Sequence, residues 1–223
     1  EVLGSGTVAL FKGTGGNDHN ATGEVYLNNY FRKQKHFFDF VTYTGNGSNN
    51  HSISHSLGSY PGLMIVKRTD GTGDWICYHN NVGITKYLKL NTDDQATTDS
   101  SVWANVGEDT IVLNSSSLVN GDGNEYVAYI WAVGGSNNQV FGQDMDMPII
   151  KAGNFTYNGT GVNVDCDFEP QWVIAKSYSG GNSDWYMWDT TAGFDTTEYL
   201  QVNVNDAGTP RTTTNGNNYI EPY

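Results

Sequence analysis

The stretch "PGLMIVKRTDGTGDWICYHN", residues 61–80, decides the fold. Its first apolar run does not alternate with polar residues, and a strand that is apolar on both faces is covered on both faces. A short Gly-rich loop follows, and Asp74-Trp75 then opens a second apolar run. We therefore expect a β-hairpin in the middle of a covered sheet. Lys67 and Asp74 would flank its turn as a weak cross-strand ion pair.

The chain contains a second version of this stretch, "PQWVIAKSYSGGNSDWYMWD" at residues 170–189. The neighbouring segments match as well. "FVTYTGNG" (40–47) and "NFTYNGTG" (154–161) each predict a strand that runs into an Asn-Gly turn. "YLKLNTDDQA" (87–96) and "YLQVNVNDAG" (199–208) close the matched region. A repeat of this length is long enough to form a whole sheet or a small domain.

Six positions define the repeat, and we expect them in or beside the core. They are Pro61 and Pro170, Trp75 and Trp185, and Tyr87 and Tyr199. Each proline is expected at the mouth of an apolar strand, where its missing N–H need not join the ladder. Each tryptophan opens the second strand of its hairpin, and aromatic side chains supply much of the area buried between layers.

The repeat divides the chain into three parts. Residues 1–33 resemble the end of a preceding repeat, because "TVAL" and "EVYLNNYF" follow the order of the strands expected within residues 109–134. Residues 34–135 form the first repeat, and residues 136–223 form a truncated second one. Two explanations compete: the array extends beyond this chain, or the N-terminal strands complete the second repeat.

Composition predicts an all-β protein built from antiparallel, sandwich-like domains. Gly numbers 27 and aromatic residues reach 13%, while charged residues make up only 16%. Residues that suit pleated surfaces are abundant, and good helix formers are sparse. We expect the two cysteines, Cys77 and Cys166, to be buried free thiols, with a disulfide as the alternative.

The formal net charge is −13, from 11 basic and 24 acidic residues. Such a charge repels a phosphate backbone and an anionic lipid surface, so nucleic acids and membranes are not expected partners. No apolar run approaches the ~20 residues of a membrane-spanning helix.

Several segments together resemble a known family: "FFDFVTYTGNGS", "HSLGSYPGLMIVKR", "DWICYH", "YLKLNTDD" and "GNEYVAYIWA". The chain is similar to a β-rich repeat domain of unknown function found in tail-fibre and other virion-associated proteins of tailed phages, especially marine and cyanobacterial ones. The resemblance covers most of the chain. The second copy departs from the pattern, since "DCDFE" replaces "HSLG" before the apolar strand.

The resemblance implies a structural role on the surface of a virion, in an exposed appendage that contributes to host attachment. Other virion proteins and further copies of the chain are then the expected partners, in a homo-oligomer, with host surface glycans as an additional one. The family brings no established chemistry.

The residues themselves do not predict an enzyme, a cofactor or a metal centre. The alternating acids of sandwich-fold glycosidases are missing, and Asp144/Asp146 and Asp165/Asp167 read as solvated loop acids, with calcium as the alternative. His51 and His55 are too far apart on a strand to chelate one ion, so we expect them at the surface.

Four aromatic residues are candidates for contact with a glycan: Trp103, Trp131, Tyr78 and Trp188. Aromatic rings stack on sugars, but they also fill the space between sheets. Three functions therefore remain open. A virion structural protein is favoured, a carbohydrate-binding or receptor-binding module is the alternative, and a polysaccharide depolymerase is the third.

Overall fold

The structure is a computed structural model that describes residues 30–134, 147–157, 159, 162–190, 198–203 and 211–212. The chain divides into two compact units, Glu1–Phe31 and Arg32–Tyr223, and the fold below is that of the second unit. The strands expected within residues 1–33 lie outside the described residues, apart from residues 30–33, where no strand is present.

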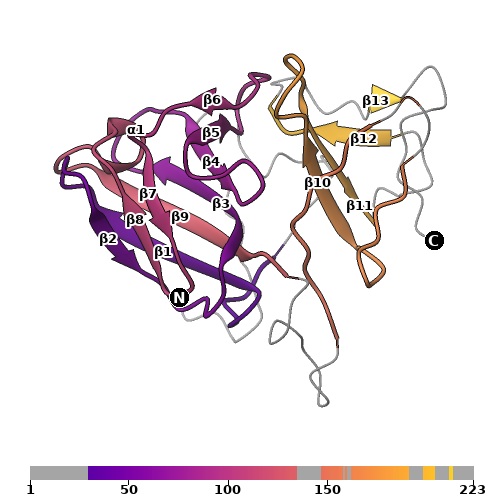
Figure 1. Cartoon of the computed structure of the whole chain (residues 1–223), viewed down its shortest axis with the longest axis horizontal. Helices are drawn as coiled ribbons and strands as arrows, with labels where there is room; N and C mark the ends of the chain where they lie inside the picture. The colour runs from indigo at the N-terminus through magenta and orange to yellow at the C-terminus, as the bar shows by residue number, and fades with distance from the viewer. Residues whose placement is uncertain are drawn as a thin grey trace, which may run out of the picture. The chain divides into compact units, whose positions relative to one another are not determined.

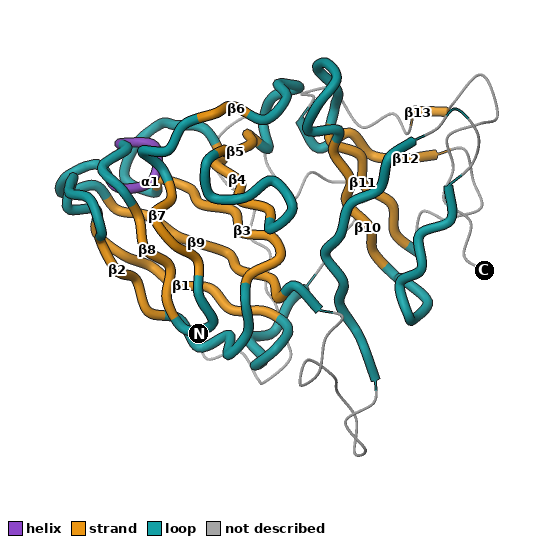
Figure 2. Tube along the Cα trace, viewed as in Figure 1, coloured by secondary structure: helices purple, strands orange, loops and turns teal. Residues whose placement is uncertain are grey.

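The described elements are nearly all strands, as Figures 1 and 2 show. They are β1 (Phe38–Thr44), β2 (His51–Ser54), β3 (Pro61–Arg68), β4 (Trp75–His79), β5 (Lys86–Lys89), β6 (Thr97–Thr98), β7 (Trp103–Val106), β8 (Thr110–Leu113), α1 (Ser117–Asn120), β9 (Glu125–Ala132), β10 (Trp172–Lys176), β11 (Trp185–Asp189), β12 (Glu198–Gln201) and β13 (Arg211–Thr212).

These strands form three antiparallel sheets. The orders are β1-β9-β3-β4-β5-β6, β2-β8-β7 and β10-β11-β12-β13. Every pairing between neighbouring strands is antiparallel. The prediction of an all-β, antiparallel, sandwich-like fold is confirmed.

Strand β3 lies inside the six-stranded sheet, between β9 and β4, and both of its faces are buried. Met64 and Val66 belong to one apolar cluster, and Leu63 and Ile65 belong to another. The unbroken apolar run of the sequence thus has a layer to cover each face. Its partner β4 divides in the same way, with Ile76 and Tyr78 in the first cluster and Cys77 in the second.

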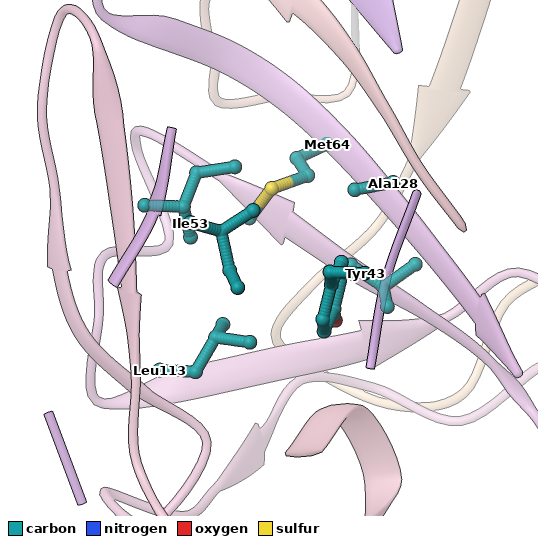
Figure 3. A pocket seen from close by; sticks show the side chains of 7 residues that line it. Tyr43, Ile53, Met64, Leu113 and Ala128 are labelled. Atoms are coloured by element: carbon teal, nitrogen blue, oxygen red, sulfur yellow. The ribbon is translucent and has the colours of Figure 1, made fainter. Parts of the chain in front are cut away.

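The first cluster fills the space between the six-stranded and three-stranded sheets. Figure 3 shows part of it, where Tyr43, Ile53, Met64, Leu113 and Ala128 converge from both layers. These side chains leave no room between them for a water molecule. The sandwich therefore has a closed interior here, as protein cores ordinarily do.

The second cluster covers the opposite face of the six-stranded sheet. Leu63, Ile65, Cys77 and Leu88 meet Trp185, and Ile174 and Tyr178 pack against the same group. The cover therefore comes from the β10–β11 hairpin, the part of the chain that matches β3–β4 in sequence.

The two hairpins have the same pairing as well as similar sequences. Lys67 pairs with Trp75 next to the turn of β3–β4, and Lys176 pairs with Trp185 next to the turn of β10–β11. In each sheet a short strand, β5 or β12, then pairs with the second strand of the hairpin. Cys77 lies opposite Leu88 in the first sheet, and Met187 lies opposite Leu200 in the second. The order β3-β4-β5-β6 thus corresponds to β10-β11-β12-β13, residue by residue.

The correspondence stops upstream of the hairpins. Residues 40–44 belong to β1, which pairs with β9, but residues 154–157 form no strand, contrary to the sequence expectation. Phe155 and Tyr157 are exposed, and no described strand lies beside them. A strand needs a neighbour to satisfy its backbone groups, so the local sequence pattern is not sufficient.

The one described helix, α1, is a single turn that the sequence did not indicate. Ser116 caps it by accepting a hydrogen bond from the Leu118 N–H. Its last residue, Asn120, is fully buried, and its side-chain amide ties several loops together. The amide oxygen accepts from the Asn46 N–H and contacts His51 Nδ1, and the amide nitrogen donates to the carbonyls of Ser48 and Asn114.

Candidate functional site

The best-defined group of polar side chains lies at the turn end of the β3–β4 hairpin, around Trp75. We call Lys67, Asp74, Trp75, Lys89 and Asn91 the Trp75 cluster. The Trp75 N–H donates to Asn91 Oδ1 at 2.9 Å, and Asn91 Nδ2 donates to Asp74 Oδ1 at 2.8 Å. The ammonium of Lys89 lies 3.0 Å from Asp74 Oδ2. Lys67 Nζ lies 5.8 Å from the centre of the Trp75 ring and donates to the Gly73 carbonyl at 2.5 Å.

These contacts hold Asp74 in its ionised form. The hydrogen bonds from Asn91 and Lys89 lower the pKa of Asp74 below its ordinary value, against a smaller opposing effect of burial. The same contact with Asp74 raises the pKa of Lys89. Both groups are therefore charged near neutral pH, so the pair positions its surroundings and does not exchange protons there.

The matching group at the β10–β11 hairpin is built the same way, and we call it the Trp185 cluster: Lys176, Asp184, Trp185, Gln201 and Asn203. The Trp185 N–H donates to Asn203 Oδ1 at 2.8 Å, and Asn203 Nδ2 donates to Asp184 Oδ1 at 2.9 Å. Gln201 Nε2 takes the place of the Lys89 ammonium, 2.6 Å from Asp184 Oδ2. Lys176 donates to the Ser183 carbonyl, as Lys67 does to Gly73.

The two tryptophans differ in what surrounds them. Trp185 is 4% exposed, packs in the second apolar cluster, and donates its indole N–H to the Lys89 carbonyl at 2.8 Å. Trp75 is 37% exposed, so it lies at the surface and not in the core where the sequence placed it. The cause is tertiary, because the local contacts of both residues are alike and only Trp185 has a sheet to pack against.

The ion pair expected between Lys67 and Asp74 is not present, and the matching residues Lys176 and Asp184 form none either. Each lysine instead donates to a turn carbonyl, and Asp74 and Asp184 contact residues of the following strand or just after it. Burial lowers the pKa of Lys176, whose ammonium also donates to the Asp93 carbonyl at 2.9 Å. The sequence showed which residues flank the turn, but not that a third strand would lie within reach of the aspartates.

Two of the four candidates for glycan contact lie inside the sandwich. Trp103 is 1% exposed and Tyr78 is 7% exposed, and their rings meet edge to face with centres 6.0 Å apart. The Trp103 indole donates to the Lys86 carbonyl at 3.1 Å. These positions correct the expectation of a surface contact, because neither ring offers a face on which a sugar could stack.

The other two candidates are partly buried and lie against other aromatic rings. Trp131, on β9, contacts Phe38 and Tyr129, with ring centres 5.0 and 6.5 Å away. Trp188, on β11, stacks on Tyr186 at 6.0 Å. The structure thus brings none of the four candidates to the Trp75 cluster.

The remaining repeat-defining positions are placed unequally. Pro61 is buried as the first residue of β3, whereas Pro170 is partly buried and precedes the start of β10 at Trp172. Tyr87 is buried in β5. Tyr199 holds the matching backbone position in β12, opposite Arg211, and its side chain lies outside the described residues.

The histidines and cysteines also depart from expectation in part. His55 is 7% exposed and not at the surface, while His51 is half-buried beside Asn120. Both cysteines are free thiols, but only Cys77 is buried. Asp165 and Asp167 lie at the surface, and Asp167 contacts Lys151 at 2.7 Å. Asp144 and Asp146 lie outside the described residues.

Within the described ranges, no three His, Cys, Asp or Glu side chains gather as metal ligands would. The helical part of those ranges is also too short and too polar to cross a bilayer.

Sequence reasoning missed the asparagines that organise both clusters. Asn91 and Asn203 occupy the same place in "YLKLN" and "YLQVN", and this shared position was the available signal. An asparagine that ends two matched strands fits a side-chain contact with the backbone, because asparagine amides readily bond to nearby main-chain groups.

Comparison with known proteins gives one family. Residues 8–220 match the model of a family described as "Domain of unknown function (DUF7483)". No curated protein and no solved structure matches the chain.

Proposed function

The chain belongs to the DUF7483 family, a domain of unknown function, and we propose that it is a non-enzymatic structural protein of a tailed-phage virion. In this proposal it forms part of a tail fibre or another exposed appendage on the particle surface and contributes to host attachment. Its partners are other virion proteins and further copies of itself.

One observation supports the proposal: two hairpins of the chain have the same pairing and similar sequences, and one of them packs on the sheet that contains the other. The strand order, the register and the polar contacts of the Trp75 and Trp185 clusters correspond. Architectures that stack one structural unit on the next suit elongated scaffolds, because each unit contacts mainly its neighbours. The resemblance to virion-associated repeat domains supports the same role.

The closed core also fits a scaffold. The sandwich interior seen in Figure 3 has no room for a water molecule, so this part of the chain holds no enclosed small-molecule site. Ligand pockets of proteins are ordinarily several hundred Å³ in volume. A partner would therefore contact the outer surface of the domain.

The test is whether the chain travels with particles. Lysates of infected hosts that carry the gene are separated on a density gradient, and the fractions are probed with an antibody to the chain. We expect the chain to sediment with the capsid proteins and to be labelled on appendages by immunogold microscopy. If it stays at the top of the gradient while the capsid proteins sediment, the virion role is wrong.

The exposure of Trp75 favours carbohydrate binding as a second candidate function. Its ring is partly exposed on a strand, and the Lys67 ammonium lies 5.8 Å from the ring centre. Sugar sites often combine an aromatic face with such groups. A glycan array separates this candidate from a purely structural role. Binding that is lost in Trp75→Ala and kept in Tyr60→Ala, a substitution at another exposed aromatic residue, would support it.

A further inference from the structure

The indole N–H of Trp75 is a hydrogen-bond donor that has no acceptor among the described residues. Its counterpart Trp185 shows what such a tryptophan binds in this chain: the Lys89 carbonyl, 2.8 Å from Nε1. The two side chains leave their strands from matching positions and are held by matching asparagines. The environment of Trp185 is therefore a template for a partner of Trp75.

The Lys89 carbonyl is available because it lies at an open edge of β5. The Leu90 N–H donates to the Trp75 carbonyl, and successive backbone groups of a strand point to opposite sides, so those of Lys89 point away from β4. The short strand β6 pairs only with Lys86 and Tyr87. Trp185 thus satisfies an edge carbonyl that the β5–β6 ladder does not reach, and Leu90 packs in the same cluster.

The second sheet repeats this edge, but without a tryptophan in it. The Val202 N–H donates to the Trp185 carbonyl, so the backbone groups of Gln201 point away from β11. None of the described residues donates to the Gln201 carbonyl, and Gln201 Oε1 is buried without a hydrogen-bond partner. Val202 corresponds to Leu90, yet it is 37% exposed.

We propose that Trp75 of one copy docks on the β12 edge of a second copy. Its indole donates to the Gln201 carbonyl, and its ring packs against Val202, as Trp185 does at Lys89 and Leu90 within one chain. Among the described residues, the Trp75 indole N–H and the Gln201 carbonyl thus form no hydrogen bond with each other or with another group, and they lie on different sheets.

A second copy fits both surfaces better than a glycan or an unrelated protein does. The acceptor edge is that of a strand whose register matches β5, and Met187 stands where the first sheet has Cys77. Donor and acceptor are different surfaces, so the contact is head-to-tail and leaves one of each free on every pair. Contacts of this kind build rings or open filaments, in contrast to closed two-fold dimers.

This inference rests on the proposed structural role and names the surface through which copies would join. Experiments can reject the docking surface without rejecting the virion role. A chain that sediments with particles but does not self-associate through Trp75 keeps the virion role and loses the docking surface.

The test measures mass against concentration by sedimentation velocity, for the whole chain and for variants. We expect the wild-type chain to associate as its concentration rises. Trp75→Ala should weaken association about 30-fold, the loss that a buried interface tryptophan typically gives. Trp75→Phe keeps a ring but no N–H and should fall between the two. Tyr60→Ala, at an exposed aromatic residue away from the cluster, should match the wild type.

Mixing tests the head-to-tail geometry. Val202→Glu places a charge on the acceptor edge at an exposed position, so the fold should tolerate it. Trp75→Ala keeps its acceptor edge and Val202→Glu keeps its donor. An equimolar mixture should therefore form one-to-one pairs at concentrations where each variant alone stays monomeric. A wild-type chain that is monomeric at all concentrations, or variants that associate as the wild type does, would overturn the proposal. A mixture that stays monomeric would overturn it as well.

Thermal melting of each variant separates a lost contact from a lost fold. If Val202→Glu melts well below the wild type, Val202→Lys replaces it in the mixing experiment, since it also opposes apolar docking and carries the opposite charge. Failure of both to pair with Trp75→Ala, with both folded, counts against the proposal.

Discussion

Asn91 and Asn203 each make two contacts that fix a tryptophan at the start of its strand. The amide oxygen accepts the backbone N–H of Trp75 or Trp185, and the amide nitrogen donates to the preceding aspartate. At the start of β4 the Trp75 carbonyl accepts from the Leu90 N–H. The Trp75 N–H has no such backbone acceptor on this side, and the Asn91 side chain accepts its hydrogen bond instead.

Asn91→Ala should therefore destabilise the protein by about 1–2 kcal/mol, since it removes two hydrogen bonds and leaves the Trp75 N–H without its acceptor. Chemical denaturation measures the change in the free energy of unfolding. Asn81→Ala is the matched control, because Asn81 is exposed and its side chain makes none of the hydrogen bonds described, so its effect should stay within about 0.5 kcal/mol. Equal effects of both substitutions would contradict this role of Asn91.

His55 makes stability depend on pH in mild acid. Burial lowers the pKa of His55 below its ordinary value, although the Gly107 backbone and, to a smaller extent, Asp39 and Asp109 oppose the shift. Its Nδ1 accepts the Leu57 N–H at 3.3 Å, so the buried ring is neutral and loses this contact when protonated. Burial lowers the pKa of His79 too, and its Nδ1 accepts the Asn81 N–H.

Because the unfolded chain binds these protons first, the stabilising contribution is complete above the unfolded pKa of about 6.5 and decreases as pH falls below it. We expect the free energy of unfolding to fall as the pH decreases below about 6.5, by at most about 1.4 kcal/mol per pH unit for each histidine. His55→Gln should reduce that slope and leave the dependence from His79. A slope that is the same in wild type and variant would count against buried, neutral His55.

At the scale of the element, the hairpins were predictable and their surroundings were not. The apolar runs on both sides of a Gly-rich loop predicted β3–β4 and β10–β11 as hairpins covered on both faces, because unbroken apolar runs and turn chemistry are local properties. The burial of Trp185 and the exposure of Trp75 were not predictable, since both follow an aspartate in similar sequences. The strand expected at 154–157 failed for the same reason, because strand formation depends on a partner elsewhere in the chain.

The Trp75 and Trp185 clusters differ at one matching position, where we expect either residue to be tolerated. Lys89 and Gln201 contact the aspartates of their clusters from matching places. Lys89→Gln should change the free energy of unfolding by less than about 0.5 kcal/mol, since glutamine makes this contact in the Trp185 cluster and the ion pair is partly solvated. Lys89→Leu should cost about 1 kcal/mol by leaving Asp74 without this partner. Denaturation in urea measures both, and a large loss in the glutamine variant would show that the clusters are not equivalent.

Replacing each tryptophan by alanine should distinguish the buried Trp185 from the exposed Trp75 by the loss in free energy of unfolding. Trp185→Ala should destabilise by about 3–5 kcal/mol because it empties a buried site, whereas Trp75→Ala should cost less than about 1 kcal/mol in the dilute monomer. Trp185→Phe should lie between, having lost the hydrogen bond to Lys89. The measurement is again the free energy of unfolding, and a large effect at Trp75 in dilute solution would place its ring in the core after all.

At the scale of the whole molecule, the described contacts join the four-stranded sheet to the six-stranded one through few residues. Trp185, Ile174 and Tyr178 supply the apolar part, and Lys176 and Ser183 bond to the Asp93 carbonyl. The sandwich interior is larger and uses none of these side chains. We therefore expect the sandwich to be stable largely without the four-stranded sheet, and the four-stranded sheet to depend on its contact with the sandwich.

Calorimetry should detect that difference. We expect Trp185→Ala to split the melting transition, with the four-stranded sheet unfolding first and the sandwich later, because the variant loses the largest side chain of the contact between them. Wild-type protein should melt with less separation between the two steps. A variant that melts in one step at a uniformly lower temperature would show that the sandwich depends on the second sheet.

The buried amide of Asn120 has a consequence for chemical ageing. An asparagine followed by glycine deamidates when the glycine nitrogen attacks the side-chain carbonyl, and Asn120-Gly121 is such a pair. Here the Gly121 nitrogen donates to the Tyr126 hydroxyl at 2.9 Å, and the Asn120 amide is held by five contacts with neighbouring segments. Neither reacting group can turn toward the other without breaking these contacts, so the fold protects an amide that the sequence alone would leave open to deamidation.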